Sequence, residues 1–315
     1  MGILPKDIEL LPPYDDRIFK VLMTSPKAEP TLLYLASAII NRPVIKVLVR
    51  NNELPISDID EKSERFDVNC EIDHDTQADI EMQSSRMDEK PGGDHGNLKA
   101  RSIYNLCDLH SSQKSKGKVY GELFRTYQVM FCGYTVFPDR KDFINPFSMR
   151  HDKDNGLLHD AIQVLFVELS KLNELVKKPV DEMTDMEKIS VFLRYAENPD
   201  YRDVVNRVIE TKEGLAVAGE VLMGISKDER EKAIFRNRRI ALADQESNRV
   251  TREQNMVMAE KMGREEGMAE GRAEGRAEER NTIAKNLLSV GYPIEKIIMV
   301  TGLTFDEVNN LKNEK

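Results

Sequence analysis

The segment from Arg65 to Gln83, RFDVNCEIDHDTQADIEMQ, alternates apolar and polar residues on both sides of a polar turn. Apolar residues occupy every second position, at 66, 68, 70 and 72 before the turn and at 78, 80 and 82 after it. This alternation is typical of half-buried strands, because successive side chains point to opposite faces. The segment therefore predicts a β-hairpin with one apolar and one polar face.

The length of the turn decides which polar residues face each other. A hairpin must bring like faces together, and a three-residue loop pairs Ile72 with Thr76. In that register Asp67 lies opposite Glu81, about 5 Å away on the polar face. Gln83 follows on the same face of the second strand. Two facing carboxylates can hold a divalent metal, so the pattern suggests a metal-dependent phosphodiesterase.

Other segments predict helices and strands around this hairpin. Helical spacing of apolar residues covers 15–41, which Pro26 and Pro30 divide in two, and again covers 97–112. Short apolar segments predict strands at 44–50, 128–137 and 161–169, although the last also fits a helix. From residue 181 the pattern is helical without strands. These observations predict an α/β domain over 1–180 and a helical extension over 181–252.

A four-residue repeat occupies the next segment, 253–281. Glycine recurs at Gly263, Gly267, Gly271 and Gly275, with Glu, Ala and Arg at the same period. Each glycine costs a helix about 1 kcal/mol relative to alanine, and like charges four residues apart add a smaller cost. The repeat is either a frayed, solvated connector or a helix whose glycines admit a close partner helix. The composition favours the connector.

Residues 282–315 predict a small helical unit. The sequence Gly291-Tyr292-Pro293 separates two short helices, and Thr304 to Glu307 has the pattern of a capping box. The arrangement is similar to small DNA-binding units, but only Lys312 and Lys315 supply positive charge to the last helix. A packing or oligomerisation unit is favoured, and a homodimer through the C-terminal helices stays open.

Composition and charge narrow the classes of function. No apolar run approaches the roughly 20 residues of a membrane span. Cys70, Cys107 and Cys132 have no ligand spacing and are expected to be buried thiols, which indicates a reducing, cytoplasmic setting. The net charge is −9, with 14 acidic against four basic residues over 51–97 and four against nine over 98–150. An acidic segment followed by a basic one suits a metal site beside a phosphate-binding surface.

Several motifs together are similar to a known family. Arg101 and Tyr104 share one face of the predicted helix, where they could contact a phosphate, and Asp16 lies beside Lys20 in the first helix. The segments DRIFK, FDV, IEMQ, Arg101 with Tyr104, GKVY and VTGLTFDEV resemble the Rpn-type PD-(D/E)XK nucleases, described as recombination-promoting nucleases or transposases. The likeness covers roughly residues 10–180, with the repeat and tail in addition.

The resemblance implies a restriction-endonuclease-like α/β core with a mixed central sheet flanked by helices. It further implies that Asp67 and Glu81 ligate Mg²⁺, that Asp16 assists, and that Gln83 occupies the position of the superfamily lysine. An amide cannot act as a cation or a general base, but it can orient a water. Lys20 or Lys99 could supply the missing positive charge, although solvated lysines are the more common case.

Two functions remain in contention at this point. The first is a metal-dependent DNA endonuclease linked to recombination or mobile elements, with Arg101 positioning the phosphate. The second is a catalytically inactive DNA-binding or assembly module that keeps the nuclease fold. The facing carboxylates and the basic segment favour the enzyme.

Overall fold

The computed structural model of the chain describes residues 4–50, 68–84, 96–113 and 120–313. Its centre is a six-stranded sheet with the strand order β1-β2-β3-β4-β6-β5. The central strands β3, β4 and β6 are parallel, and β1, β2 and β5 pair antiparallel at the two sides. The mixed sheet that the family resemblance implies is therefore confirmed. The strands are β1 Val47–Val49, β2 Val68–Ile72, β3 Thr76–Gln83, β4 Arg125–Cys132, β5 Ile144–Phe147 and β6 Ile162–Glu168.

Strands β2 and β3 form the predicted hairpin in the predicted register. Ile72 pairs with Thr76 and Val68 with Ile80, so the loop has three residues. Two of these, Asp73 and His74, have positive φ angles of 47° and 61°, which a tight hairpin turn requires. The partner expected to face Glu81, Asp67, lies outside the described residues.

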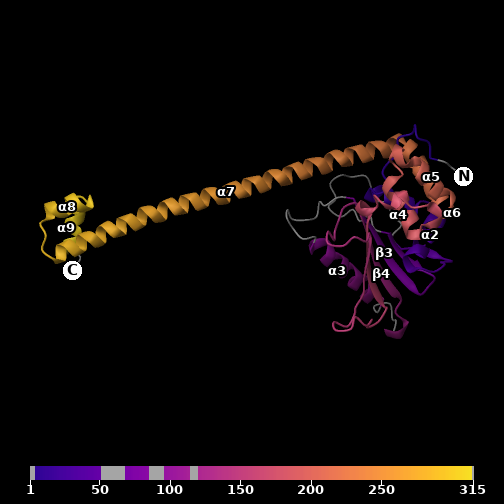
Figure 1. Cartoon of the computed structure of the whole chain (residues 1–315), viewed down its shortest axis with the longest axis horizontal. Helices are drawn as coiled ribbons and strands as arrows, with labels where there is room; N and C mark the ends of the chain where they lie inside the picture. Colours follow the sequence, from indigo (N-terminus) through magenta and orange to yellow (C-terminus); the bar gives the residue numbers. More distant parts are fainter. Residues whose placement is uncertain (1–3, 51–67, 85–95, 114–119, 314–315) are drawn as a thin grey trace. The chain divides into compact units, whose positions relative to one another are not determined.

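Helices cover both faces of the sheet. In Figure 1, α3 lies on one side of β3 and β4, while α2, α4, α5 and α6 lie on the other. The helices that precede the C-terminal region are α1 Asp16–Thr24, α2 Glu29–Ile40, α3 Gly96–Ser112, α4 Asp185–Tyr195, α5 Arg202–Glu210 and α6 Glu213–Lys227. The break between α1 and α2 confirms the division expected from the prolines, and Pro30 lies in the first turn of α2.

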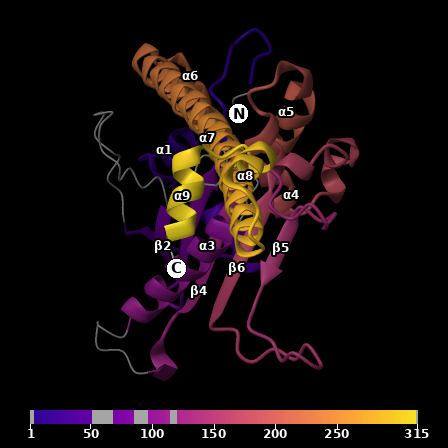
Figure 2. The same ribbon diagram turned by 90° about the vertical axis from the view of Figure 1, so that its left-hand side faces the viewer.

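Strand β4 contributes side chains to two separate cores because it is buried on both faces. Val129 and Phe131 join the larger core, which α1, α2 and α4–α6 complete. Met130 and Cys132 point the other way into a smaller core with Leu98 of α3 and residues of β6. Figure 2 shows the same sheet from the side, with β5 next to β6 and α4 near α5. The parallel strands are thus fixed in place from both sides.

The end of β4 and the presence of β5 differ from the sequence-based prediction. Strand β4 ends at Cys132 rather than at 137, because Gly133 follows it and donates its N–H to Gln83 O. A Cβ at Gly133 would lie 2.9 Å from Ser84 O, so glycine permits the ends of β3 and β4 to approach. The short strand β5 had no counterpart in the prediction. It contains Pro146, which is tolerated because β5 is an edge strand.

The chain divides into two compact units, Met1–Arg238 and Arg239–Lys315. The finer functional division at residues 180, 252 and 281 stays a prediction. Among the cysteines, Cys70 and Cys132 are buried as expected, but Cys107 is exposed on α3, which corrects that prediction. Cys107 falls on the solvent side of the helix, three residues from the exposed Tyr104.

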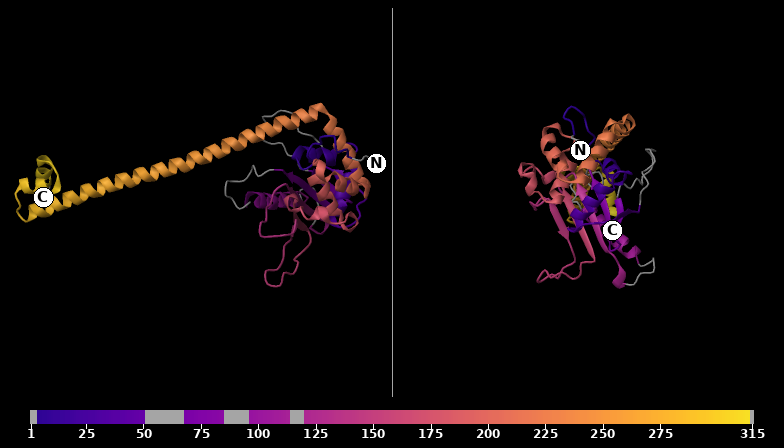
Figure 3. Two further views of the ribbon diagram at one scale, coloured as in Figure 1. Left: turned by 45° about the horizontal axis from the view of Figure 1, so that its top comes forward. Right: turned by 90° about the vertical axis from the view of Figure 1, so that its right-hand side faces the viewer.

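Helix α7, Glu229–Ser289, continues without interruption through the glycine repeat (Figure 3). Residues 263–280 are exposed and helical, and the choice between a solvated connector and a helix that admits a close partner stays a prediction. A Cβ added at Gly263, Gly267, Gly271 or Gly275 would meet nothing within 4 Å. After it come α8, Ile294–Thr301, and α9, Phe305–Asn313, where Thr304 and Glu307 exchange the predicted capping-box hydrogen bonds.

Candidate active site at the carboxyl end of β3

Glu81 is the centre of a polar cluster on the face of β3 that α3 covers. Its side chain is 11% exposed and accepts hydrogen bonds from four side chains among the described residues. Gln83 Nε2 lies 3.1 Å and Arg101 Nη2 3.4 Å from Oε2. Asn105 Nδ2 lies 2.9 Å and Gln128 Nε2 3.1 Å from Oε1. One carboxylate therefore receives donors from β3, α3 and β4.

The local geometry of each element explains why these donors converge. Arg101 and Asn105 are four residues apart, so they lie on one face of α3. Gln83 is two residues from Glu81 and points to the same face of β3. Gln128 pairs with Asp79, two positions before Glu81, so its side chain also reaches that face from the neighbouring parallel strand. The cluster is thus a consequence of the sheet register and the helix period.

Gln128 is completely buried and only half satisfied. Its Nε2 donates to Glu81 and approaches the Met130 sulfur at 3.4 Å. Its Oε1 has no hydrogen-bond partner in the described part of the chain. An unsatisfied buried acceptor costs about 1–3 kcal/mol, and a donor or cation that reached this oxygen would offset that cost.

Asp16, the first residue of α1, reaches the end of β3. Its Oδ1 accepts the Ser84 N–H at 3.0 Å, and its Oδ2 lies 3.2 Å from Arg238 Nη2. Burial raises the pKa of Asp16, and the Arg238 guanidinium and the Ser84 N–H act in the opposite direction. Asp16 therefore contacts Ser84, the residue that directly follows Gln83, and both of its carboxylate oxygens are engaged.

The four residues predicted to bind substrate differ in burial and in their contacts. Lys20 is 2% exposed, so it is a buried lysine and not a solvated one. The Lys99 ammonium lies 5.0 Å above the Phe137 ring. Tyr104 is 71% exposed. Arg101, the fourth residue proposed to bind substrate, donates to Glu81.

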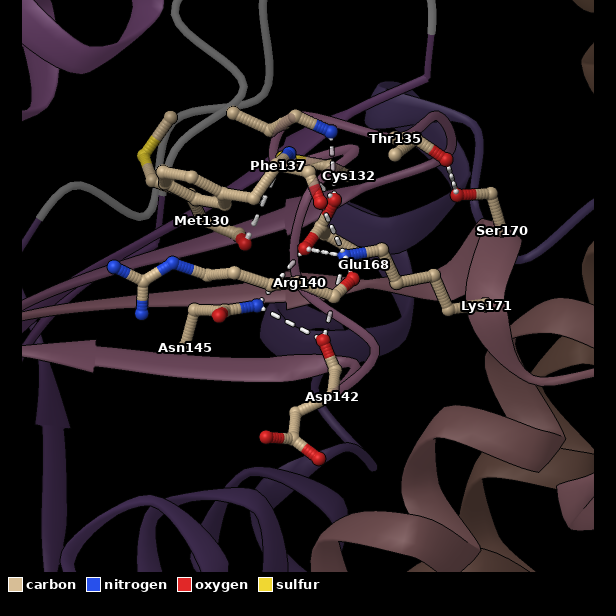
Figure 4. A network of polar contacts seen from close by, with 11 residues as sticks. Met130, Cys132, Thr135, Phe137, Arg140, Asp142, Asn145, Glu168, Ser170 and Lys171 are labelled. Atoms are coloured by element: carbon tan, nitrogen blue, oxygen red, sulfur yellow. Dashed lines mark hydrogen bonds and ion pairs between the residues drawn. The ribbon is translucent and has the colours of Figure 1, made fainter.

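A second buried carboxylate, Glu168, lies at the carboxyl end of β6 (Figure 4). It accepts the backbone N–H groups of Val136 and Phe137 at 2.6 and 3.0 Å, the Asn145 amide at 2.8 Å and the Lys171 ammonium at 2.7 Å. Four donors satisfy its lone pairs and its charge. Glu168 therefore holds the segment that follows β4, and the Lys171 ammonium at 2.7 Å compensates its charge.

Sequence comparison agrees with this architecture. A model of the PD-(D/E)XK nuclease family transposases matches residues 13–251, which include the whole sheet and the cluster around Glu81. The chain belongs to the PD-(D/E)XK nuclease family transposases. A search of curated proteins and a search of solved structures each gave no significant match.

Membership in this family supports a nuclease role connected with mobile elements, and PD-(D/E)XK nucleases use divalent metals and act on DNA. The chemistry of the site fits such a metal, since Glu81 and the unsatisfied Oε1 of Gln128 are hard oxygen ligands. No group of three or more His, Cys, Asp and Glu residues suited to a metal occurs among the residues that the structure describes. Within the described ranges, no helix has the length and apolarity to span a membrane.

Sequence reasoning overlooked several residues of this candidate site. Asn105 was detectable, because it lies four residues after Arg101 on the same helix face. Gln128 was hidden inside an apolar strand segment, where a single polar residue is the only signal. Ser84 and Arg238 had no local signal, since they contact Asp16 from 68 and 222 residues away.

Proposed function

We propose that this protein is a Mg²⁺-dependent DNA endonuclease that hydrolyses phosphodiester bonds in the service of recombination or of a mobile element. The observation that carries the proposal is the Glu81 carboxylate, held by donors from three elements at the end of a parallel strand in a PD-(D/E)XK fold. Such convergence at strand ends is typical of catalytic sites in α/β sheets.

Asp67 and Glu81 would hold the metal in this proposal. Mg²⁺, when bound, would supply Lewis-acid activation of a water and neutralise the charge that develops on the phosphate. The amides of Gln128 and Asn105 keep Glu81 oriented. Both are neutral, so they leave the negative charge of Glu81 available to a cation.

Gln83 and Arg101 would act on water and substrate. The Gln83 amide donates to Glu81 at 3.1 Å, and its oxygen can accept a hydrogen bond from a water and so orient it. The Arg101 side chain is 34% exposed and at 3.4 Å is the most distant of the four donors to Glu81. A guanidinium carries five N–H donors and can contact a phosphate oxygen in addition to a carboxylate, which supports the predicted role in positioning DNA.

The experiment is nicking of supercoiled plasmid with Mg²⁺ by wild type, Asp67→Ala and Glu81→Ala. The proposal expects cleavage by the wild type, none with a chelator, and a loss of at least about 100-fold in each variant. Full activity in both variants would refute the site. A folded wild type that binds DNA and cleaves none of it under any divalent metal would instead support a binding or assembly module.

A further inference from the structure

The first turns of α7 are fastened to the start of α1 by two charge pairs. Glu231 receives the guanidinium of Arg17, with Nη2–Oε1 at 3.1 Å and Nε–Oε2 at 3.3 Å. Two helical turns later, Arg238 lies 3.2 Å from Asp16 and 3.7 Å from Asp15. Residues seven apart lie on the same side of a helix, so one face of α7 makes both contacts.

The Arg238 pair differs from the Arg17 pair because it continues into the candidate active site. Asp16 uses its second oxygen to accept the N–H of Ser84. Ser84 directly follows Gln83, which itself contacts Glu81. A continuous set of contacts therefore runs from Arg238 through Asp16 to the end of β3. Among the hydrogen bonds between described residues, Arg17 and Glu231 contact neither Asp16 nor Ser84.

The ion pair between Asp16 and Arg238 is largely shielded from solvent. The side chains of Asp16 and Arg238 are 24% and 21% exposed, so water screens the pair weakly. A carboxylate with one oxygen held by a guanidinium and the other by a backbone N–H has a fixed orientation. Removal of the guanidinium frees one oxygen of Asp16 and allows the side chain to rotate away from Ser84.

We propose that Arg238 is a positioning residue of the nuclease: through Asp16 it fixes the carboxyl end of β3, and with it Gln83 and Glu81. The inference rests on the proposed nuclease function for its effect on catalysis. If Arg238 has this role, the start of α7 supports the active site, although Arg238 is 222 residues from Asp16 in the chain.

The test compares full-length Arg238→Gln, Arg238→Lys and the matched control Arg17→Gln, which breaks a charge pair between the same two helices. Hydrogen exchange of the Ser84 amide reports on the end of β3 without reference to activity, and calorimetric Mg²⁺ binding and plasmid nicking report on the site. We expect Arg238→Gln to speed Ser84 exchange and to weaken Mg²⁺ binding and nicking by about tenfold. Arg238→Lys should restore part of each effect, and Arg17→Gln should leave all three near wild type.

A second comparison shows whether Arg238 acts through Asp16. In an Asp16→Ala background, adding Arg238→Gln should change Ser84 exchange and nicking no further. The proposal would be overturned if the effects of Asp16→Ala and Arg238→Gln on Ser84 exchange and nicking were additive, or if Arg17→Gln lowered nicking as much as Arg238→Gln. Arg238 would then serve only to attach α7 to α1. If the wild type cleaves no DNA, the proposed nuclease function fails, while Ser84 exchange still decides whether Arg238 positions the end of β3.

Discussion

Gln128 shows how one residue can lower stability while it supports a site. Its amide nitrogen orients Glu81, but its buried oxygen is left without a partner. An unsatisfied buried acceptor destabilises the fold, and natural proteins retain such groups where function requires them. Gln128 is therefore the residue at which stability and activity are expected to diverge.

Gln128→Leu tests this divergence. The substitution removes the unsatisfied oxygen and one donor to Glu81 while nearly preserving volume, so we expect stability to change by less than about 1 kcal/mol. Nicking should fall by about tenfold, because Glu81 loses an orienting hydrogen bond. Urea denaturation and plasmid nicking measure the two effects. A large loss of stability with full activity would show that Gln128 is purely structural.

The site could be predicted only in part from the sequence, for a physical reason. Glu81 and Gln83 belong to one alternating strand, and Arg101 lies on the helix that follows, so local periodicity brings them together. Arg238 reaches Asp16 through the packing of two helices from opposite ends of the domain. No local pattern encodes that contact, because it depends on how the whole core assembles.

Among the helices and strands, the length of the segment and the regularity of its apolar positions decided whether it could be predicted from the sequence. Segments with a complete apolar face, such as β3 and α3, matched their predicted positions. Strand β5 has four residues and includes Pro146, so it has too little pattern to recognise. Helix α7 continues through the repeat although the four glycines there have low helix propensity. The stability of this part of α7 is therefore worth testing.

The N-terminus of α4 allows a pH-dependent prediction. Glu187 closes a capping box with Thr184 and lies 2.8 Å from the Lys178 ammonium. Burial acts to raise the pKa of Glu187, whereas the Lys178 ammonium and the Thr184 N–H act to lower it. The lowering effects are larger, so the pKa of Glu187 lies below its usual value. A lowered carboxyl pKa stabilises the fold above the pKa of the unfolded state, and this stabilisation is lost as pH falls through the folded pKa.

We therefore expect Glu187→Gln to lower the free energy of unfolding by about 1 kcal/mol at neutral pH. The difference from wild type should shrink once the pH falls below about 4. Urea denaturation at both pH values measures it, with Glu174→Gln as a control, since Glu174 forms an exposed pair with Lys177. If wild type and Glu187→Gln differed equally in free energy of unfolding at both pH values, the charge of Glu187 would not be the cause of the difference.

Gly271 in α7 and Gly302 at the end of α8 are expected to respond to alanine with opposite signs. Gly271 lies in the helix with open space where a Cβ would be, so Gly271→Ala should raise helix stability by about 1 kcal/mol. Gly302 ends α8 with a φ angle of 71°, so Gly302→Ala should be destabilising. Thermal melts followed by circular dichroism measure both. A loss of stability in Gly271→Ala would indicate that a partner helix packs against the glycines.

On the scale of the whole molecule, the two compact units have separate hydrophobic cores. The C-terminal unit has a small core of Ala284, Ile297, Leu303 and Val308, with partly buried residues around it. None of these residues belongs to the two cores of the sheet domain. Separate cores allow separate unfolding.

Val308→Ala should therefore affect one unit alone. Val308 is fully buried, and its truncation is expected to cost about 2 kcal/mol. Hydrogen exchange should accelerate in α8 and α9 while the amides of β4 keep their protection. Equal loss of protection in β4 would show that the two units unfold together.

The most direct test of the central claim is the Mg²⁺ dependence of plasmid nicking in two glutamate variants of the hairpin. Glu81→Gln removes the buried carboxylate of the candidate site, whereas Glu71→Gln changes a carboxylate of β2 that pairs with Arg50 and His74. The account predicts that Glu71→Gln nicks with the Mg²⁺ dependence of the wild type and that Glu81→Gln does not nick at any Mg²⁺ concentration. Unchanged Mg²⁺-dependent nicking by Glu81→Gln would contradict it.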